Sequence, residues 1–316
     1  MGLQVHRADS RGYGVLSIRE PGPAVLSTTI APGDSVHVGM PVYNSIGCLP
    51  IAIDSILGQS HRNLRLIICD NASDDGSFEL CQEIARRDER VSVYRNPTNI
   101  GITANFNRTF ELSNAPYFLW ASSNDCFAPN MVERCLRTLR ERPDVVLCFG
   151  GTRFFESDPV HAVDYPEDLD LQAESPTARF IAVLQRLRIN NALHGLVRSS
   201  VLRHTALQLP HFSSDMVLIA ELALHGKFVQ LPEVLFYRRM DKAGSTLDMN
   251  ESQLLKYWGP GTQSGRAGDI WRMQLAFLQA VWRAPLSWRE RYLTTTYCFK
   301  GAYWSMANPR QRPVLP

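Results

Sequence analysis

The chain lacks the sequence signatures of several familiar enzyme classes. No GxGxxG follows its first apolar segment, which disfavours a nicotinamide or flavin dinucleotide fold. No GxxxxGK[ST] is present, which excludes P-loop phosphoryl transfer, and no GxSxG is present, which excludes the usual α/β-hydrolase nucleophile. The eight histidines have no metal-ligand spacing, so a zinc hydrolase is disfavoured.

Composition sets further limits. The net charge of +2 argues against bulk nucleic-acid binding, which needs a concentrated basic surface. The seven cysteines include no CxxC pair, which is typical of buried free thiols in a reducing cytosol. No apolar run approaches the roughly 18–20 residues that span a bilayer, and no signal-peptide core is visible. We therefore expect a cytoplasmic protein without a transmembrane segment and without a nucleic-acid partner.

Four short apolar segments in the first half each end in a polar cluster. They are VHVGM before PVYN, LRLIICD before NASDDGS, VSVYR before NPTNIG, and YFLWA before SSND. Each is too short for a helix and rich in the residues of buried parallel strands, with a helical stretch before the next segment. The pattern predicts an α/β fold with a Rossmann-like, mostly parallel sheet flanked by helices. The carboxyl ends of such strands meet at one edge, where ligands bind.

The chain divides into four predicted regions. Residues 1–33 are expected to form an N-terminal extension, residues 34–150 the α/β unit, residues 151–250 a second half, and residues 251–316 a helical, aromatic C-terminal region. Within the second half, the acidic, proline-broken stretch 156–176 is expected to be an exposed loop. FVQL and EVLFYRR are expected to be two strands, and SWRE is a capping box that would open a final helix.

Two of the polar clusters carry carboxylates. Asp70 ends its apolar segment, in a turn whose residues also favour ordinary turns and helix caps. Asp125, in SSND, lies five residues before Asn130, which together with Glu133 predicts a capping box for the next helix. Asp125 is therefore not needed as a cap. Carboxylates and amides at one sheet edge suit a nucleoside diphosphate that is bridged by a divalent cation.

Four longer blocks carry a resemblance. VGMPVYN, ICDNASDDGS, RNPTNIGITANFNRTF and APYFLWASSNDCFAPNM occur in an order and spacing that closely resemble the family 2 glycosyltransferases of the GT-A fold, over roughly residues 36–245. The resemblance implies a nucleotide-binding half at 34–150 and an acceptor-binding half at 151–250. The nucleotide-binding residues that it implies are Pro41, Tyr43, Asn44, Asp70, Asn99, Gly101, Asn105, Ser123 and Asn124.

The resemblance also implies a Mn²⁺ or Mg²⁺ ion on the diphosphate. Family members usually carry two adjacent acids where this chain has Asn124 and Asp125. Three arrangements remain open: Asp125 binds the metal, Asn124 binds it through its carbonyl oxygen, or the metal is held loosely. Many relatives carry Arg-x-His after the last strands, where this chain has Arg239 and Asp241, and Asp241 is a further candidate ligand.

Inverting sugar transfer needs a carboxylate base for the acceptor hydroxyl. By resemblance this base is Asp215, in the first turn of a predicted helix, although an acid there is also stabilised by the helix dipole at about 0.3–1 kcal/mol without any catalytic role. His194, Gly195 and Arg239 are weaker candidates for contact with the donor or acceptor sugar.

Five of the six tryptophans lie in the C-terminal region, at positions 258, 271, 282, 288 and 304. They are expected either to pack against the catalytic domain or to form an acceptor platform or a membrane-surface patch. Peripheral contact with the inner membrane face is therefore left open, as is the oligomeric state.

The leading hypothesis is an inverting glycosyltransferase that uses a nucleotide-sugar donor, most simply a UDP-sugar, and a saccharide, lipid-linked or small-molecule acceptor. One alternative is a degenerate relative that binds a nucleotide or glycan without turnover, suggested by Ser123 and Asn124 in the metal loop. A sugar-phosphate nucleotidyltransferase is disfavoured, because PVYNSIG lacks the glycine-rich loop and basic residue that bind a triphosphate.

Overall fold

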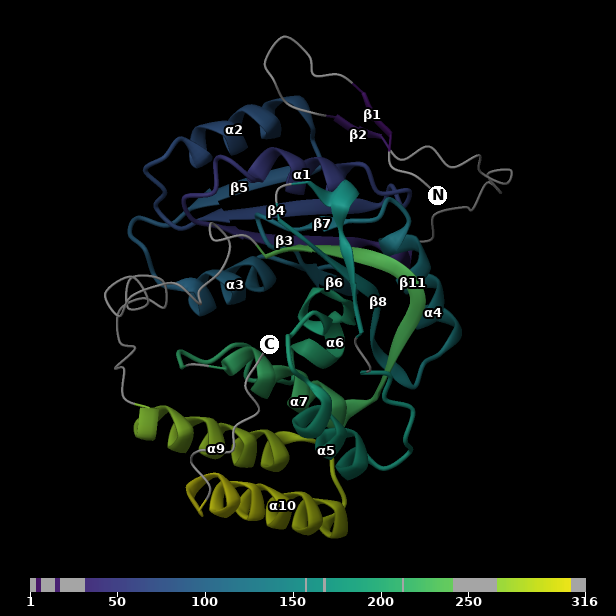
Figure 1. Cartoon of the computed structure of the whole chain (residues 1–316), viewed down its shortest axis with the longest axis vertical. Coiled ribbons are helices and arrows are strands. Elements are labelled where there is room, and N and C mark those ends of the chain that lie inside the picture. Colours follow the sequence, from purple (N-terminus) through teal and green to yellow (C-terminus); the bar gives the residue numbers. More distant parts are fainter. Residues whose placement is uncertain are drawn as a thin grey trace.

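The computed structural model describes residues 4–6, 15–17, 32–156, 158–166, 169–211, 213–240 and 266–307. Strands β1 (Gln4–His6) and β2 (Val15–Ser17) pair with each other. The first half then alternates strands and helices as the sequence predicts (Figure 1). Its elements are η1 (Pro32–Asp34), β3 (Val36–Val42), α1 (Leu49–Leu57), β4 (Leu64–Asp70), α2 (Ser77–Arg87), β5 (Val91–Arg95), α3 (Ile102–Glu111) and β6 (Tyr117–Trp120).

The second half is more mixed. Its elements are β7 (Cys126–Phe127), α4 (Met131–Glu141), β8 (Val145–Phe155), η2 (Pro159–His161), β9 (Val163–Tyr165), α5 (Pro176–Arg186), η3 (Ala192–His194), β10 (Leu196–Arg198), α6 (Ser199–Leu202), α7 (Ser214–His225), β11 (Lys227–Arg239), α9 (Arg266–Arg283) and α10 (Trp288–Ala307). FVQL and EVLFYRR form one long strand, β11, rather than two. β8 runs across position 150, so the two halves share one sheet.

One nine-stranded sheet organises the chain. Its order is β5-β4-β3-β6-β10-β8-β11-β7, and β9 pairs with β8. Strands β3 to β6 run parallel, as do β8 and β11, whereas β10, β7 and β9 run antiparallel to their neighbours. Val42 lies in register with Asp70, and Asp70 with Arg95. The strand ends therefore meet at one edge, and the expected mostly parallel α/β fold is confirmed.

Close packing of α3 against β3 fixes the position of the loop that precedes α3. A Cβ atom on Gly39, in the middle of β3, would lie 2.3 Å from Thr109 Oγ1 and 2.5 Å from the Phe118 ring. Only glycine allows α3 to approach this closely, which is the usual reason for glycine inside a strand. The approach holds the start of α3 near the carboxyl ends of β4 and β5.

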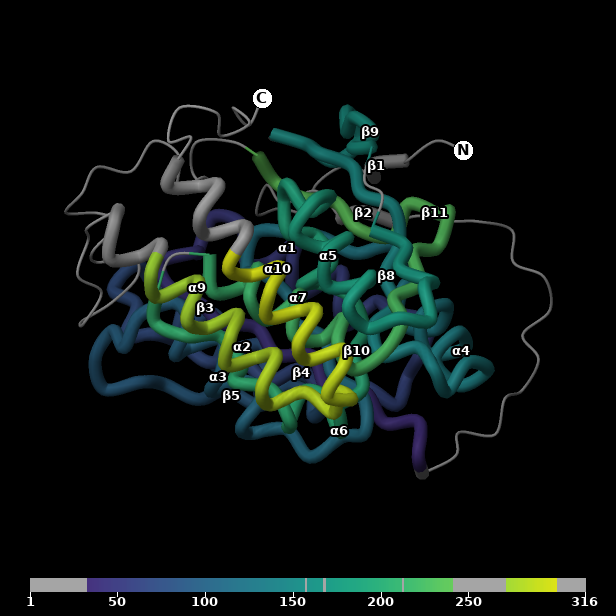
Figure 2. Tube along the Cα trace, turned by 90° about the horizontal axis from the view of Figure 1, so that it is seen from below, coloured from purple at the N-terminus to yellow at the C-terminus, as the bar shows by residue number. Residues whose placement is uncertain are grey.

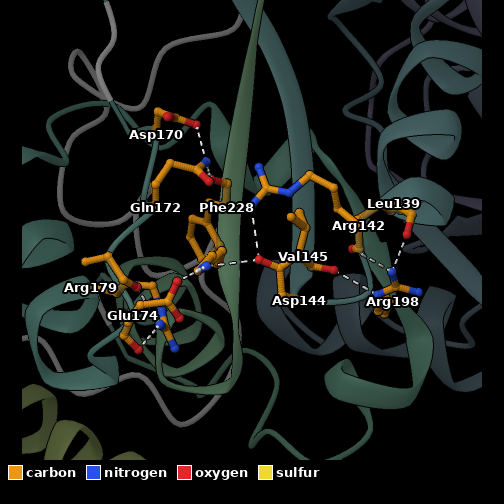
Figure 3. A network of polar contacts seen from close by, with 12 residues as sticks. Leu139, Arg142, Asp144, Val145, Asp170, Gln172, Glu174, Arg179, Arg198 and Phe228 are labelled. Carbon is orange, nitrogen blue, oxygen red and sulfur yellow. Dashed lines mark hydrogen bonds and ion pairs between the residues drawn. The ribbon is translucent and has the colours of Figure 1, made fainter.

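The stretch 156–176 is not simply an exposed loop. It contains η2 and β9, and its last part lies against the start of β11, where Leu171 exchanges two backbone hydrogen bonds with Phe228. Figure 3 shows the polar contacts around this point. Gln172 donates to the Phe228 carbonyl, and Lys227 pairs with both Asp144 and Glu174. This network ties together the starts of β8 and β11, at the sheet edge opposite the strand ends described above.

Two predicted helix caps have different outcomes. Ser287 and Glu290 form the expected capping box at the start of α10, with the Glu290 carboxylate accepting from the Ser287 N–H and hydroxyl. The predicted box of Asn130 and Glu133 is wrong. Asn130 makes no side-chain cap bond, and Glu133 accepts from the Ser60 hydroxyl instead.

The C-terminal helices α9 and α10 lie side by side below the sheet, on the outside of α5 and α7 (Figures 1 and 2). Among the described residues, no helix has both the length and the apolar character that crossing a membrane requires.

Candidate active site at the carboxyl edge of the sheet

The loop after β3 is tied to the loop after β4. The Asn44 N–H donates to Ser73 Oγ, and Asn44 Oδ1 accepts from the Asp74 N–H. Asn44 has a positive φ of 47°, a conformation that asparagine tolerates better than most residues. Pro41 is the last but one residue of β3 and Tyr43 directly follows the strand, so both lie at the predicted edge, Pro41 buried and Tyr43 half-buried.

Four asparagines hold the loops after β4 and β5 together. Asn96 Nδ2 donates to Asn71 Oδ1 and to Asn105 Oδ1, and Asn105 Nδ2 donates to the Cys69 carbonyl. Asn71 Nδ2 donates to Asn99 Oδ1, which also accepts from the Gly101 N–H. Both ends of the Asn105 amide are therefore occupied by the protein itself. We call Asn71, Asn96, Asn99 and Asn105 the asparagine cluster.

Asp70 is fully buried beside this cluster. Its Oδ2 accepts from the Ser73 N–H and lies 3.3 Å from Arg95 Nε. Its Oδ1 has no hydrogen-bond partner within the described part of the chain. A buried acceptor without a partner is costly, so this oxygen is suited to accept a hydrogen bond from a bound ligand.

The SSND loop joins the first half of the site to the second. Ser123 Oγ lies 2.8 Å from Ser45 Oγ, in the loop after β3. Asp125 is almost fully buried, and its Oδ1 accepts from the Arg239 N–H at the end of β11. Asn124 is partly exposed beside it. The loop is thus held by a strand that lies more than a hundred residues further along the chain.

His194 lies behind the SSND loop. Its Nδ1 contacts the Trp120 carbonyl at 2.9 Å, and because a carbonyl oxygen only accepts, this nitrogen carries the proton. Its Nε2 lies 3.5 Å from Ser122 Oγ, and its ring stacks on Phe236. Burial lowers the pKa of His194, and the negative charges of Asp125 and Asp215 oppose that shift. Both carboxylates are thus close enough to act on one imidazole.

Asp215 stands in the first turn of α7. Its Oδ2 accepts from Asn190 Nδ2 at 3.0 Å, and Asn190 is itself fixed because its Oδ1 accepts from the Leu193 N–H. Asp215 Oδ1 has no partner among the described residues, and the side chain is half-buried. One oxygen is therefore oriented while the other remains available to a ligand.

These contacts form a continuous path across the edge. It runs from Asp70 through Ser73 to the loop after β3, and through Ser45 and Ser123 to the SSND loop. From there it continues through Ser122 to His194, in the 190–194 segment that also binds Asp215. The three predicted carboxylates, Asp70, Asp125 and Asp215, thus belong to one connected region.

The remaining predicted residues take different positions. Gly195 is buried, and a Cβ there would lie 2.9 Å from the Cys148 carbonyl, so its small size serves the packing of β10 against β8. The Arg239 guanidinium lies over the Phe155 ring and donates to the Glu156 carbonyl. Gly101 has a φ of 87°, which favours glycine at the start of α3. Asp241 lies outside the described residues.

Comparison with known proteins identifies the family. The model of Glycosyl transferase family 2 matches residues 37–194, half of the chain. The chain belongs to this family. The matched range contains the asparagine cluster, the SSND loop and His194, and ends before Asp215.

Several relatives and solved structures are similar. A Haemophilus influenzae protein described as an uncharacterized glycosyltransferase is 31% identical over 137 residues, which cover 43% of this chain and 54% of the relative. Glycosyltransferase GlyG of Streptococcus pneumoniae is 27% identical over 39% of this chain and 41% of its own length. The chain thus covers about half or less of these curated relatives. A crystal structure of S. aureus TarS 1–349 in complex with UDP-GlcNAc has a TM-score of 0.63 at 13% identity, over 87% of this chain and 74% of that one. This likeness confirms the GT-A fold.

The residues present fit a divalent cation only together with a ligand. No group of three His, Cys, Asp or Glu side chains within the described ranges could hold a metal ion. Asp125 supplies one carboxylate, and Asn124 a neutral oxygen beside it. Mg²⁺ is commonly bound in this way, by one or two carboxylates with substrate phosphates and water completing the shell.

Sequence reasoning missed several residues of this region. Asn190 follows no local pattern that would link it to Asp215, and Asn71 and Asn96 were visible only as ordinary turn residues. Arg238, whose guanidinium donates to Asn191 Oδ1, was overlooked beside Arg239. The pair Asn190–Asn191 directly before a short turn was the one available signal, since asparagines favour such positions.

Proposed function

We propose that this chain transfers a sugar from a nucleotide-sugar donor to an acceptor hydroxyl, with inversion at the anomeric carbon and with Asp215 as the general base. The observation that carries the proposal is the connected path from Asp70 to Asp215, in a chain that belongs to glycosyl transferase family 2. Its two ends are suited to the two halves of the reaction, nucleotide binding and proton removal.

A uridine diphosphate sugar is the donor that we propose. The partnerless Oδ1 of Asp70 is suited to accept from the imide N–H of uracil, which is a donor that cytosine lacks. Arg95 holds the other oxygen of Asp70, so the orientation of the carboxylate is fixed before a ligand arrives. The TarS structure in complex with UDP-GlcNAc, which has the same fold, supports the same donor class.

In the proposed reaction, Asp215 Oδ1 takes the proton from the acceptor hydroxyl. The hydroxyl oxygen attacks the anomeric carbon from the face opposite the diphosphate, and the bond from that carbon to the diphosphate oxygen breaks with its electron pair. Asn190 keeps Asp215 Oδ2 engaged, so that Oδ1 is the oxygen presented to the acceptor.

We propose that Asp125, with Asn124 beside it, binds a Mn²⁺ or Mg²⁺ ion on the diphosphate. The bound ion would stabilise the charge that develops on the leaving diphosphate. The Arg239 N–H holds Asp125 Oδ1, which orients the carboxylate for this task. The acceptor, whether a saccharide, a lipid-linked molecule or a small molecule, is not fixed by the residues of the site.

Asp215→Asn tests the proposal. The wild type is incubated with UDP-sugars and Mg²⁺ or Mn²⁺, and both slow donor hydrolysis and transfer to an acceptor panel are measured. The variant should lose transfer by about a thousandfold, because general-base catalysis contributes 10²–10⁴. It should keep the UDP-induced rise in melting temperature. Loss of the UDP response as well would assign Asp215 a structural role, and a wild type that binds UDP but turns over no donor would favour the non-catalytic alternative.

A further inference from the structure

The hairpin formed by α9 and α10 carries an exposed aromatic stripe that the proposed reaction does not use. We call it the aromatic stripe, and its members are Trp271, Leu275, Trp282, Trp288, Tyr292 and Phe299. Each is at least 55% exposed. Large aromatic groups that gather on one outer face of a protein usually mark an interaction surface.

The stripe lies on the face of each helix that points away from the protein body. In α9 the members recur at spacings of four and seven residues, while Phe277, Ala280 and Val281 on the opposite face are buried. In α10 the same spacings separate Trp288, Tyr292 and Phe299. Figure 2, seen from below, shows the two helices side by side on the outside of the molecule.

The hairpin is fixed to the body, so the stripe cannot turn inward. Phe277 packs edge-on against Phe180 of α5, and Thr294 lies 2.7 Å from Thr177 of the same helix. Arg283 pairs with Glu221, a fully buried acid in α7. These contacts use the inner faces of both helices and leave the outer faces to solvent.

The corner of the hairpin is held in place by one arginine. Arg291 donates to four carbonyls in and after the last turn of α9, at residues 281, 282, 284 and 286. Its guanidinium lies 5.1 Å from the ring centre of Trp282 and 5.9 Å from that of Trp288, and the two rings meet edge to face. The tryptophans are thus positioned before any partner arrives, which lowers the entropic cost of binding.

The charge of the hairpin indicates the chemistry of the partner. Arg272 directly follows Trp271 and Arg289 directly follows Trp288, whereas Arg283, after Trp282, pairs with Glu221 on the inner face. Residues 271–299 contain four arginines and one acid, Glu290, and because Glu221 of α7 neutralises Arg283, the hairpin keeps a formal charge of +2. A second copy docked on this face by two-fold symmetry would bring two such surfaces together, which like charges oppose.

We propose that the aromatic stripe docks on an anionic lipid bilayer, with α9 and α10 lying in the plane of the interface. Tryptophan and tyrosine favour the boundary between headgroups and acyl chains, and arginines beside them reach the lipid phosphates. The hairpin would thereby hold the enzyme at a membrane surface without inserting across it.

Vesicle co-sedimentation tests this proposal. The full chain should sediment with vesicles of equal parts phosphatidylcholine and phosphatidylglycerol, and much less with phosphatidylcholine alone. The double variant Trp271→Ser/Trp288→Ser should bind the mixed vesicles at least tenfold more weakly. Arg289→Glu should weaken binding by about tenfold, since it replaces a positive charge near the anionic surface with a negative one. Tyr94→Ser, which removes an exposed aromatic from the edge strand β5, is the matched control and should bind like the wild type.

Three results would overturn the inference. The first is that the double variant binds mixed vesicles as tightly as the wild type, and the second is that the wild type binds both kinds of vesicle equally. The third is that the wild type forms a dimer without lipid and the double variant does not. The last would assign the stripe to a second copy of the chain. The variants should melt at the temperature of the wild type, as expected for substitutions at exposed positions, which establishes that they are folded. Donor hydrolysis by the double variant should be unchanged. A failure of lipid binding is thus distinct from a failure of the proposed activity.

Discussion

The two sides of the candidate site use polar residues in different ways. On the side of β4 and β5, the asparagines of the cluster bond mostly to one another and to the backbone, although Asn96 Oδ1 is buried without a partner among the described residues. On the side of α7 and the SSND loop, Asp215 has one oxygen held by Asn190 and the other without a partner among the described residues. The cluster holds loops in place, whereas Asp215, like Asp70 beside the cluster, keeps one oxygen for a ligand.

This difference teaches how to separate structural from functional polar residues at one sheet edge. Residue type does not separate them, because asparagines occur on both sides. The separating property is whether the donors and acceptors of a side chain are already used by the protein. Asn105 was expected to bind nucleotide by resemblance, yet both ends of its amide have protein partners. A stabilising role is therefore the one that its contacts support.

The largest effect on stability is expected for Asn105→Leu. The substitution leaves the Cys69 carbonyl without its donor in a buried site and should lower the free energy of unfolding by about 3 kcal/mol. Urea denaturation measures the change. Asn130→Ala is the control, since Asn130 is exposed and makes no cap bond, and it should change stability by less than about 0.5 kcal/mol. Unchanged stability of the leucine variant with weakened UDP binding would instead favour direct nucleotide contact by Asn105.

A smaller effect, on turnover alone, is expected for Asn190→Ala. Without the Asn190 amide, Asp215 loses the bond that orients it, and kcat should fall about tenfold with KM for the donor unchanged. Asn190→Asp should move the acidic limb of the pH–rate profile to higher pH, because two adjacent carboxylates resist being charged together. If kcat of the alanine variant falls only together with its melting temperature, and the pH–rate profile of the aspartate variant does not move, Asn190 has a structural rather than a positioning role.

The smallest expected effect is a pH dependence of stability that His194→Gln reduces. Burial holds the pKa of His194 below its ordinary value of 6.5, so below that pH the unfolded chain binds more protons than the folded chain. The free energy of unfolding should therefore fall as the pH decreases below 6.5, by at most about 1.4 kcal/mol per pH unit for each such histidine.

His37 and His225 are also shifted downward by burial and contribute in the same direction. Urea titrations on both sides of pH 6.5 should show that the glutamine variant has a shallower slope, by about one proton. An equal slope in both proteins would mean that His194 is protonated in the folded state as readily as in the unfolded state.

The sequence predicted the first half of the molecule well because its signals are local. Short apolar segments separated by amphipathic stretches specify parallel strands with crossover helices, and strand ends such as Asp70 then meet without any long-range information. Asp215 at the start of a helix was reached through the family resemblance, and that helix is present as α7.

What the sequence did not predict depends on contacts between distant residues. The predicted cap at Asn130 is displaced because Gln59, 73 residues earlier, accepts from the Val132 N–H at the start of α4. Arg239 holds Asp125 through its backbone N–H, which no side-chain pattern can reveal. Asn190 reaches Asp215 only because η3 and α7 pack together. Each is a tertiary contact that overrides or supplements a local preference.

The register of β11 has a consequence for sequence variation in this chain. The strand pairs with β8 along its length, but the pairing shifts between Leu231 and Val234 and again before Phe236. Successive side chains of a strand point to opposite faces, so deleting one residue from this interrupted stretch would reverse the orientation of everything after it. Phe236 would leave the imidazole on which it stacks, and the amide that holds Asp125 would point elsewhere. Functional homologues should therefore preserve the number of residues between positions 231 and 239, even where they change which amino acids stand there.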